Sequence, residues 1–519
     1  MKKPLICLCL VLCQILCLVL GACHPSPTPD GSSTGQDDTT ADIETETETE
    51  TETQTDDGRV TVEIICPIEG AAVFEGGALV QDVTDKPFEP VSFSLKRGYV
   101  YEGYEIDGQL YQGTEIALEN VTEDTTVTLK LDYVTRELPI VHIDTGDASI
   151  YSTEEYVDMR FDLVNTEDEI FNAGGGIRLR GNSTSGYPKK PYRIKFNQKV
   201  SLFGLDKAKS WVLLADYLDP SCMHNTAAFY LGATSDALGF TPTVHHVNLY
   251  LNGEFMGLYT LCEQVQENDG RMGLEQTITP DMTDLDQFNF YVCLDEDVQF
   301  DPEAIRGEDY FYVAWCNKYF SLKYPKKEDF CSDEQFYSFF EQLEKHYNKI
   351  LDACRDGNAK KMKAYMDVDS LIDHMIIDQI MGERDHVWKS FYSYQIAGEK
   401  LRFGPIWDYD YSLYVPWTNA PNEYYTVDTR IEYSNEFFRG VARSDELYSL
   451  LCERYQSHWS DVLSDCIAHV QSYEQDISES LELNRALWYG NKPDIAEDNY
   501  DFLVKFLKSR HRVLKQEWR

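Results

Sequence analysis

The amino-acid sequence predicts an α+β protein in which a small all-β domain precedes a larger domain. Residues 59–134 alternate apolar and polar side chains between glycine-rich turns, a pattern typical of short antiparallel strands. Residues 135–519 are too many for one ordinary domain. Their alternation continues to about residue 266, after which apolar residues recur at helical spacing. We therefore expect a β-rich part followed by a helix-rich part, which could form two lobes.

Residues 1–23 predict a lipoprotein signal peptide. Two lysines precede an apolar run from Pro4 to Val19, and the tetrapeptide LGAC ends at Cys23. This is the order of a secretory signal and its cleavage site. Because LGAC resembles a lipobox, Cys23 is expected to carry the lipid of an exported, membrane-anchored protein. The alternative is an uncleaved spanning helix, since the run approaches the roughly 20 residues needed to cross a bilayer.

Residues 24–58 predict a disordered acidic tether rich in Thr and Glu. They contain eleven acidic residues, no basic residue and no aromatic residue, so this segment has nothing to bury. Acidity also pervades the rest of the chain, and the formal net charge of the whole sequence is −43. Such a charge repels nucleic acid and anionic lipid surfaces. We therefore expect no nucleic-acid partner, and contact with the membrane only through the lipid.

The small β domain resembles a module of bacterial surface proteins. Its sequence GYVYEGYEIDG, followed by LENVTEDTTVTLKL, is similar to the internalin-type B-repeat. That resemblance implies a non-catalytic spacer or an adhesive module. Beyond the signal peptide the chain has nine cysteines without C-x-x-C spacing, which indicates neither a cysteine zinc site nor a disulfide framework.

A basic segment interrupts the acidic chain between Ile170 and Leu205, where there is no Asp or Glu. Its seven basic residues flank a GNSTSG turn and are Arg178, Arg180, Lys189, Lys190, Arg193, Lys195 and Lys199. Because side chains alternate along strands, the two arms of a hairpin can present these bases on one face. Fixed positive charge beside the backbone N–H groups of a turn suits a polyphosphate. The alternative is a solvated face, or one paired with acids elsewhere.

Three carboxylates follow predicted elements in the second half of the chain. Asp385 comes after a strongly helical segment, and Asp408 and Asp410 come after the apolar run LRFGPIW. A loop carboxylate can accept a hydroxyl proton, and another can hold magnesium between phosphates. Asp408 and Asp410 point the same way if their segment is extended. The alternative is that each caps a helix or a turn.

These segments together resemble the CotH kinase family of atypical protein kinases. The similarity covers roughly residues 137–415 and continues in the helical tail to Arg519. The motifs that carry it are LPIVHIDT, IRLRGNSTSGYPKKPYRIKF, LFGLDKAKSWVLLADYLDPSCMHN, VNLYLNGEFMGLYTLCEQV, FSLKYPK, RDHVWKSFYSY and FGPIWDYDYSL.

The resemblance implies a two-lobed, protein-kinase-like fold that binds ATP with Mg²⁺ or Mn²⁺ and phosphorylates Ser or Thr of exported proteins. Asp385 matches the catalytic-loop aspartate of the family. Asp408 matches the metal-binding aspartate that opens the WDYD motif, and Asp410 is a candidate second ligand. Ser390 departs from the family, which has Asn at this metal-binding position. A serine hydroxyl is a poorer metal ligand than an amide oxygen.

Other nucleotide contacts are expected from the β-rich part. The sequence VNLYLNGEFMGLYTLCEQV predicts a hairpin that leads to a hinge, where the backbone of Glu263 and Val265 could meet adenine. The segment WVLLADY lacks the usual phosphate-binding lysine of kinases. Lys190 and Lys195 are the candidates to replace it, and Arg180 belongs to the same basic face.

Two other functions stay open at this point. Ser390 and the adhesive-looking β domain suit a pseudokinase or a non-catalytic surface-attachment lipoprotein. A carbohydrate enzyme with paired carboxylates would suit the aromatic content of 13%. However, no acid and nucleophile pair stands out apart from the kinase-like carboxylates.

Overall fold

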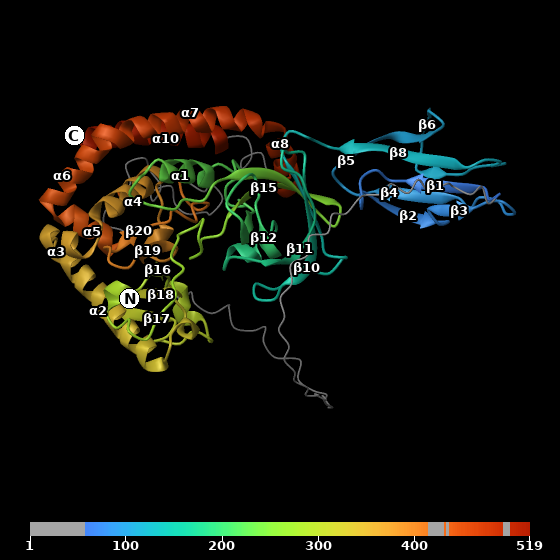
Figure 1. Cartoon of the computed structure of the whole chain (residues 1–519). Helices are drawn as coiled ribbons and strands as arrows, with labels where there is room; N and C mark the ends of the chain where they lie inside the picture. Colours follow the sequence, from blue (N-terminus) through green and yellow to red (C-terminus); the bar gives the residue numbers. More distant parts are fainter. Residues whose placement is uncertain (1–57, 414–429, 432–434, 491–498) are drawn as a thin grey trace, which may run out of the picture. The chain divides into compact units, whose positions relative to one another are not determined.

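The computed structural model describes residues 58–413, 430–431, 435–490 and 499–519 (Figure 1). Cys23, the signal peptide and residues 24–57 of the tether lie outside the described residues. Within the described ranges, no helix has the length and apolar character needed to span a bilayer. Helices and strands are both abundant, so the predicted α+β class is confirmed.

Eight strands form the small β domain. They are β1 (Thr61–Ile65), β2 (Ala72–Gly76), β3 (Val80–Asp82), β4 (Val91–Leu95), β5 (Tyr99–Ile106), β6 (Gln109–Tyr111), β7 (Glu115–Ile116) and β8 (Thr125–Tyr133). One sheet has the order β3-β1-β8-β5-β6 and the other β2-β4-β7. The alternating side chains bury Val62, Phe93 and Val127 between them. The antiparallel expectation was wrong for one pair, because β1 and β8 run parallel.

A closed barrel follows, with strand order β10-β11-β12-β13-β15-β14-β9. Its strands are β9 (Ile140–Asp144), β10 (Val157–Val164), β11 (Ile170–Leu179), β12 (Tyr192–Val200), β13 (Ala208–Leu214), β14 (His245–Leu251) and β15 (Glu254–Glu263). The predicted hairpin of β14 and β15 is confirmed. It turns at Asn252-Gly253, where both residues have positive φ, as a tight hairpin turn requires. Parallel pairing of β14 with β9 closes the barrel.

The second half of the chain contains a sheet that the helical pattern did not reveal. Its order is β17-β18-β16-β19-β20. The strands are β16 (Phe290–Leu294), β17 (Tyr310–Val313), β18 (Lys318–Tyr324), β19 (Phe391–Gln395) and β20 (Arg402–Phe403). Every residue of β16 is buried, so this strand has no polar face to produce alternation.

Helices pack around this sheet, and the later helix α8 packs against barrel strand β15. They are α1 (His224–Ala233), α2 (Asp333–Arg355), α3 (Ala359–Tyr365), α4 (Val368–Met381), α5 (Glu436–Arg443), α6 (Asp445–Arg454), α7 (Ser460–Asp476), α8 (Ser478–Trp488) and α10 (Asn499–Glu517). Short 3₁₀ helices include η1 (Thr184–Gly186), η2 (Leu285–Gln287), η3 (Glu296–Phe300), η4 (Lys327–Asp329) and η5 (Asp385–Val387), and η7 (Tyr455–Trp459) is a π-helical turn. In Figure 1, α7 and α10 run side by side.

Helix α4 is the centre of the helical part, since thirteen of its fourteen residues are buried. Asp367 caps its first turn by accepting from the N–H groups of Asp369 and Ser370. Gly382 ends the helix in the left-handed conformation with φ 63°. Because the helix ends at a fixed position, the loop that carries Asp385 begins directly after it.

Two sets of contacts hold the barrel between its neighbours in the chain. From the β domain, Lys96 Nζ donates to the Asn252 carbonyl at 2.7 Å, and Gly98 O accepts from the Tyr250 hydroxyl at 2.7 Å. From α8, Asn484 Oδ1 accepts from Leu258 N at 3.2 Å. The barrel is therefore contacted by the turn between β4 and β5, which precedes it in the chain, and by a helix some 200 residues after it.

Candidate active site

A small cavity lies where the basic hairpin meets the WDYD segment. Its lining includes Arg180, Tyr187, Lys189, Asp216, Asn225, Trp407, Asp408 and Asp410. The free volume is only about 30 Å³, enough for a small ion or a water molecule. A second pocket of about 870 Å³ is lined by Arg193, the segment 264–267, Tyr291 and Tyr392. That volume lies in the range of roughly 300–1,000 Å³ that suits organic ligands.

The hairpin of β11 and β12 presents its bases as the alternation predicts. Arg178 lies directly opposite Arg193, while Ile177 and Ile194 are buried inside the barrel. Arg178 Nε and Arg193 Nε are buried and have no hydrogen-bond partner among the described residues. An unpaired buried N–H is costly, and an anion beside the hairpin would satisfy both. The basic face is thus preorganised for a ligand with negative charge.

Asp385 occupies the loop after α4 and begins η5. Its backbone N–H donates to Glu383 Oε1 at 2.5 Å, which fixes the turn. Lys389 Nζ lies 3.9 Å from Asp385 Oδ2 and 3.8 Å from Asp297 Oδ2. Burial raises the pKa of Asp385, an effect that Lys389 opposes and Asp408 reinforces. The carboxyl is therefore placed among other acids with one nearby ammonium group.

Ser390 and Asp408 face each other from two loops. The Ser390 hydroxyl donates to Asp408 Oδ2 at 2.7 Å. Both residues have left-handed backbones, with φ 58° at Ser390 and 70° at Asp408. Such values are uncommon outside glycine and cluster at functional sites. Because Asp408 is left-handed, the extended segment on which Asp408 and Asp410 would point the same way does not form at Asp408. Both side chains nevertheless line the small cavity.

The carboxylates around this cavity repel one another. Burial raises the pKa of Asp410 well above its usual range, and the charges of Asp408, Asp216 and Asp385 add to it. A divalent cation would relieve this repulsion. Magnesium is usually held by one or two carboxylates together with substrate phosphates. Asp408 and Asp410 fit that role, and Ser390 adds a hydroxyl beside them.

The three other predicted basic site residues, Arg180, Lys190 and Lys195, lie in different surroundings. The Arg180 guanidinium lies 5.3 Å from the Trp407 ring centre, at the wall of the small cavity. Lys190 Nζ donates to the Ser185 carbonyl at 2.8 Å and so stabilises the GNSTSG turn. Lys195 is exposed on β12.

The Glu263 side chain is buried away from both pockets. Its Oε2 accepts from Thr243 N at 2.6 Å, and its Oε1 lies 3.7 Å from Arg271 Nη1. Its neighbour Val265 lines the large pocket. The segment after β15 thus borders that pocket through Val265, with Glu263 as a structural anchor.

Three residues that the sequence reasoning did not select complete the small cavity. Lys189 is fully buried, and its Nζ donates to the Leu258 carbonyl. Asp216 accepts from Thr260 Oγ1 at 2.7 Å and from Asn225 Nδ2 at 3.0 Å. Asn225 Oδ1 in turn accepts from Tyr409 N at 2.9 Å, which joins α1 to the WDYD segment. The motif PKK marked Lys189 as basic, but local pattern could not distinguish it from Lys190.

A buried network connects the Asp385 loop to the Asp408 loop. His386 Nδ1 lies 2.9 Å from Asp378 Oδ2, and His386 Nε2 lies 3.0 Å from the Trp407 carbonyl oxygen. The Tyr409 hydroxyl also donates to Asp378. Burial alone would lower the pKa of His386, but Asp378 overcomes this and raises it to about 10. The imidazolium can therefore donate to both neighbours and hold the two loops together.

The chain also matches a known protein family. The model of the CotH kinase protein family matches residues 177–514, from the end of β11 through most of α10. The search of curated proteins finds no match. The family match spans well over half of the chain and includes Asp385, Ser390, Asp408 and Asp410. The chain therefore belongs to the CotH kinase family.

Proposed function

We propose that this protein is a surface-anchored atypical kinase that transfers the γ-phosphate of ATP to Ser or Thr of exported or cell-surface proteins. The proposal rests on the basic hairpin, which contributes Arg193 to a pocket of nucleotide size and Arg180 to the small cavity. Asp408 lines that small cavity, and its charge acts on Asp385. In this proposal the barrel and the helical part are the two lobes of the kinase. Cys23 carries the lipid anchor, and residues 24–58 tether the folded part to it.

The large pocket binds the base and sugar of the nucleotide, and the basic hairpin binds its phosphates. The segment 264–267 and Tyr291 border a volume that accepts the base and sugar. Arg178 and Arg193 offer the buried N–H groups that phosphate oxygens require. Magnesium ATP would supply the transferable phosphoryl group and the cation that neutralises its charge.

The acidic residues act on the acceptor and on the cation. Asp385 is placed to orient the acceptor hydroxyl and to accept its proton, with Lys389 balancing the local charge. Asp408 is the main residue to hold the cation, and Asp410 is the second. His386 keeps the two loops in register through the Trp407 carbonyl. These roles need no covalent intermediate on the protein.

Phosphate transfer is the direct test. The purified protein is incubated with radiolabelled ATP, Mg²⁺ or Mn²⁺, and a serine-rich acceptor protein. We expect metal-dependent label on acceptor Ser or Thr, and no label when the metal is removed with a chelator. Failure to label any acceptor, in a protein that still binds ATP, would contradict the kinase proposal.

Ser390 favours one alternative, a nucleotide-binding pseudokinase. Its hydroxyl is already hydrogen-bonded to Asp408 and is a weaker metal ligand than the usual amide. A pseudokinase would bind ATP without transfer, and its surface role would rest on the β domain. The same incubation, run together with an ATP-binding measurement, separates the two functions.

A further inference from the structure

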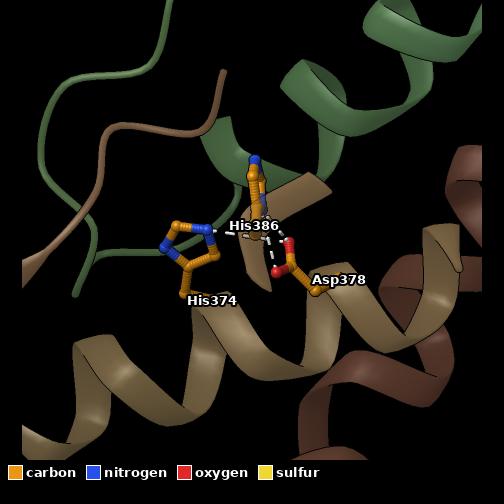
Figure 2. Close-up of side chains that lie close together, drawn as sticks. All are labelled: His374, Asp378 and His386. Atoms are coloured by element: carbon orange, nitrogen blue, oxygen red, sulfur yellow. Dashed lines mark hydrogen bonds and ion pairs between the residues drawn. The ribbon is translucent and has the colours of Figure 1, made fainter. Parts of the chain in front are cut away.

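Two histidines and one aspartate meet beneath the catalytic loop (Figure 2). His374 and Asp378 are one turn apart on α4, and His386 reaches them from the loop that follows. All three are buried, with His374 and Asp378 fully excluded from solvent. Among the described residues, one ligand atom from each lies within 4.8 Å of the other two.

His374 is the unusual member of this cluster. Both of its ring nitrogens are buried and lack a hydrogen-bond partner among the described residues. Figure 2 shows that one of them is aimed at Asp378, and His374 Nε2 lies 3.6 Å from Asp378 Oδ1. That separation is too long for a hydrogen bond. Buried polar atoms are nearly always satisfied, so an orphan imidazole pointing at a carboxylate indicates a missing ligand.

The distances suit a metal ion placed between the three side chains. Zinc binds His nitrogen and carboxylate oxygen at about 2.0–2.2 Å, so tetrahedral ligand atoms lie roughly 3.3–3.6 Å apart. His374 Nε2 is 3.6 Å from Asp378 Oδ1, and His386 Nδ1 is 2.9 Å from Asp378 Oδ2. The first separation lies within this range, whereas the second is a direct hydrogen bond that a metal ion would have to replace.

The surroundings resemble the outer shell of a metal site. His386 Nε2 lies 3.0 Å from the Trp407 carbonyl, the kind of contact that orients a ligating imidazole. The Tyr409 hydroxyl donates to Asp378 and so fixes that carboxylate. The His374 ring packs against Phe391, with ring centres 4.6 Å apart. Each candidate ligand is thereby held in place by a neighbour.

We propose that His374, Asp378 and His386 form a structural site for a divalent transition metal, with zinc as the expected ion. The ion is bound by His374 Nε2, an Asp378 carboxylate oxygen and His386 Nδ1, with a water molecule in the fourth position. Metal binding replaces the His386 Nδ1–H contact to Asp378, and that proton leaves to solvent. The site is separate from the magnesium role proposed for Asp408 and Asp410. Because His386 follows Asp385 and contacts Trp407, the metal cross-links α4 to both loops of the candidate active site.

Metal content provides the first test. The full-length chain is purified without metal-affinity steps, dialysed, and analysed by inductively coupled plasma mass spectrometry. We expect about one zinc ion per chain, and a lower melting temperature after zinc is removed with a strong chelator. Protein that holds less than a tenth of an equivalent, and takes up none when titrated with zinc, would overturn the proposal.

Variants identify the ligands. His374→Phe places a ring among existing aromatic neighbours, and we expect at least a tenfold loss of bound zinc. His346→Phe is the matched control, because His346 also has a buried unpartnered nitrogen on a helix but belongs to no such cluster. It should keep its zinc, as should Asp408→Ala. A folded His374→Phe protein that retains full zinc would overturn the assignment.

Cobalt substitution keeps the test independent of any variant. The chelator-treated wild-type protein is titrated with Co²⁺ and its visible absorption is recorded. We expect the intense bands of a four-coordinate site, which an equivalent of zinc should abolish. Only the weak bands of six-coordinate cobalt would contradict the proposal. None of these measurements depends on kinase activity, so the two proposals can fail separately.

Discussion

Ser390 and Asp408 are both conformationally constrained residues of the candidate site. Each has a left-handed backbone, and the two side chains meet at 2.7 Å. Strain of this kind persists only where the surrounding structure imposes it. Here it directs a hydroxyl and a carboxylate at the same point beside the small cavity.

Ser390→Asn restores the residue that the CotH resemblance expects. Asparagine tolerates a left-handed backbone better than serine, and its amide oxygen is a better metal ligand. We therefore expect no loss of stability and a roughly tenfold lower Mg²⁺ requirement for ATP binding. Ser390→Ala is the control and should raise that requirement. Isothermal titration with ATP at several Mg²⁺ concentrations measures both, and a higher requirement for Ser390→Asn would count against the metal role of this position.

At the scale of elements, the hairpin of β11 and β12 contributes Arg193 to the large pocket, where we propose that ATP binds. Arg193→Met should weaken ATP binding by roughly 10- to 150-fold, since a buried charge-assisted contact is worth about 1.5–3 kcal/mol. Lys199→Met, at the exposed end of β12, is the matched control and should leave affinity unchanged. Equilibrium binding of a fluorescent ATP analogue distinguishes them. Equal affinities for the two variants would mean that the hairpin is only a solvated surface.

The junction of α4 and the loop that carries Asp385 and His386 should make the stability of the protein depend on pH. Asp378 raises the pKa of His386 to about 10, while His374, Glu383 and Tyr409 also face this ring. A raised pKa stabilises the folded protein fully below pH 6.5, and the contribution is lost as pH rises toward 10. We expect metal-free protein to lose up to about 1.4 kcal/mol per pH unit in this window.

Urea unfolding between pH 6.5 and 10, after treatment with a chelator, measures that slope. His386→Gln keeps a donor but cannot titrate, so its stability should be lower at pH 6.5 and should change less with pH. An unchanged slope in His386→Gln would show that another group governs the pH dependence.

The local sequence pattern was sufficient to predict side-chain orientation within a single regular hairpin. The alternation in β11 and β12 predicted that Arg178 and Arg193 share a face, and the register confirms it. It failed for β16, whose residues are all buried, and for Asp408, whose left-handed backbone breaks the extended geometry. Neither burial on both faces nor backbone strain leaves a periodic signal.

At the scale of the whole molecule, long-range contacts determine which residues meet at the cavity, in the barrel and in the three-residue cluster, and the local sequence pattern could not predict these contacts. Asp216 reaches the cavity because it is bonded to Thr260 and Asn225, which lie on different elements. The barrel closes by pairing β14 with β9, roughly a hundred residues earlier in the chain. The three-residue cluster on α4 likewise needs the loop that brings His386 back onto the helix. Each depends on tertiary packing that composition and spacing do not encode.

The β domain is also attached to the barrel through specific contacts. At Gly98, with φ 103°, an added Cβ would lie 2.3 Å from the Phe255 Cβ and 2.8 Å from the Tyr250 ring. Gly98→Ala should therefore destabilise this junction. Gly108→Ala is the control, since Gly108 also has positive φ but nothing lies within 4 Å.

Limited proteolysis and thermal unfolding measure the effect of these two variants. We expect faster cleavage near residue 134 and a lower melting temperature for Gly98→Ala than for Gly108→Ala. Equal behaviour would indicate that backbone strain alone, and not the contact with the barrel, limits stability.

In the proposed kinase, Asp385 acts on the acceptor hydroxyl while other residues hold the nucleotide. Phosphate transfer and ATP affinity, measured together on the wild-type protein and on Asp385→Asn, test these roles. We expect transfer by the variant to fall by at least a factor of about 100, as expected for loss of a general base, while ATP affinity stays unchanged. Full transfer by Asp385→Asn would show that Asp385 does not act on the hydroxyl.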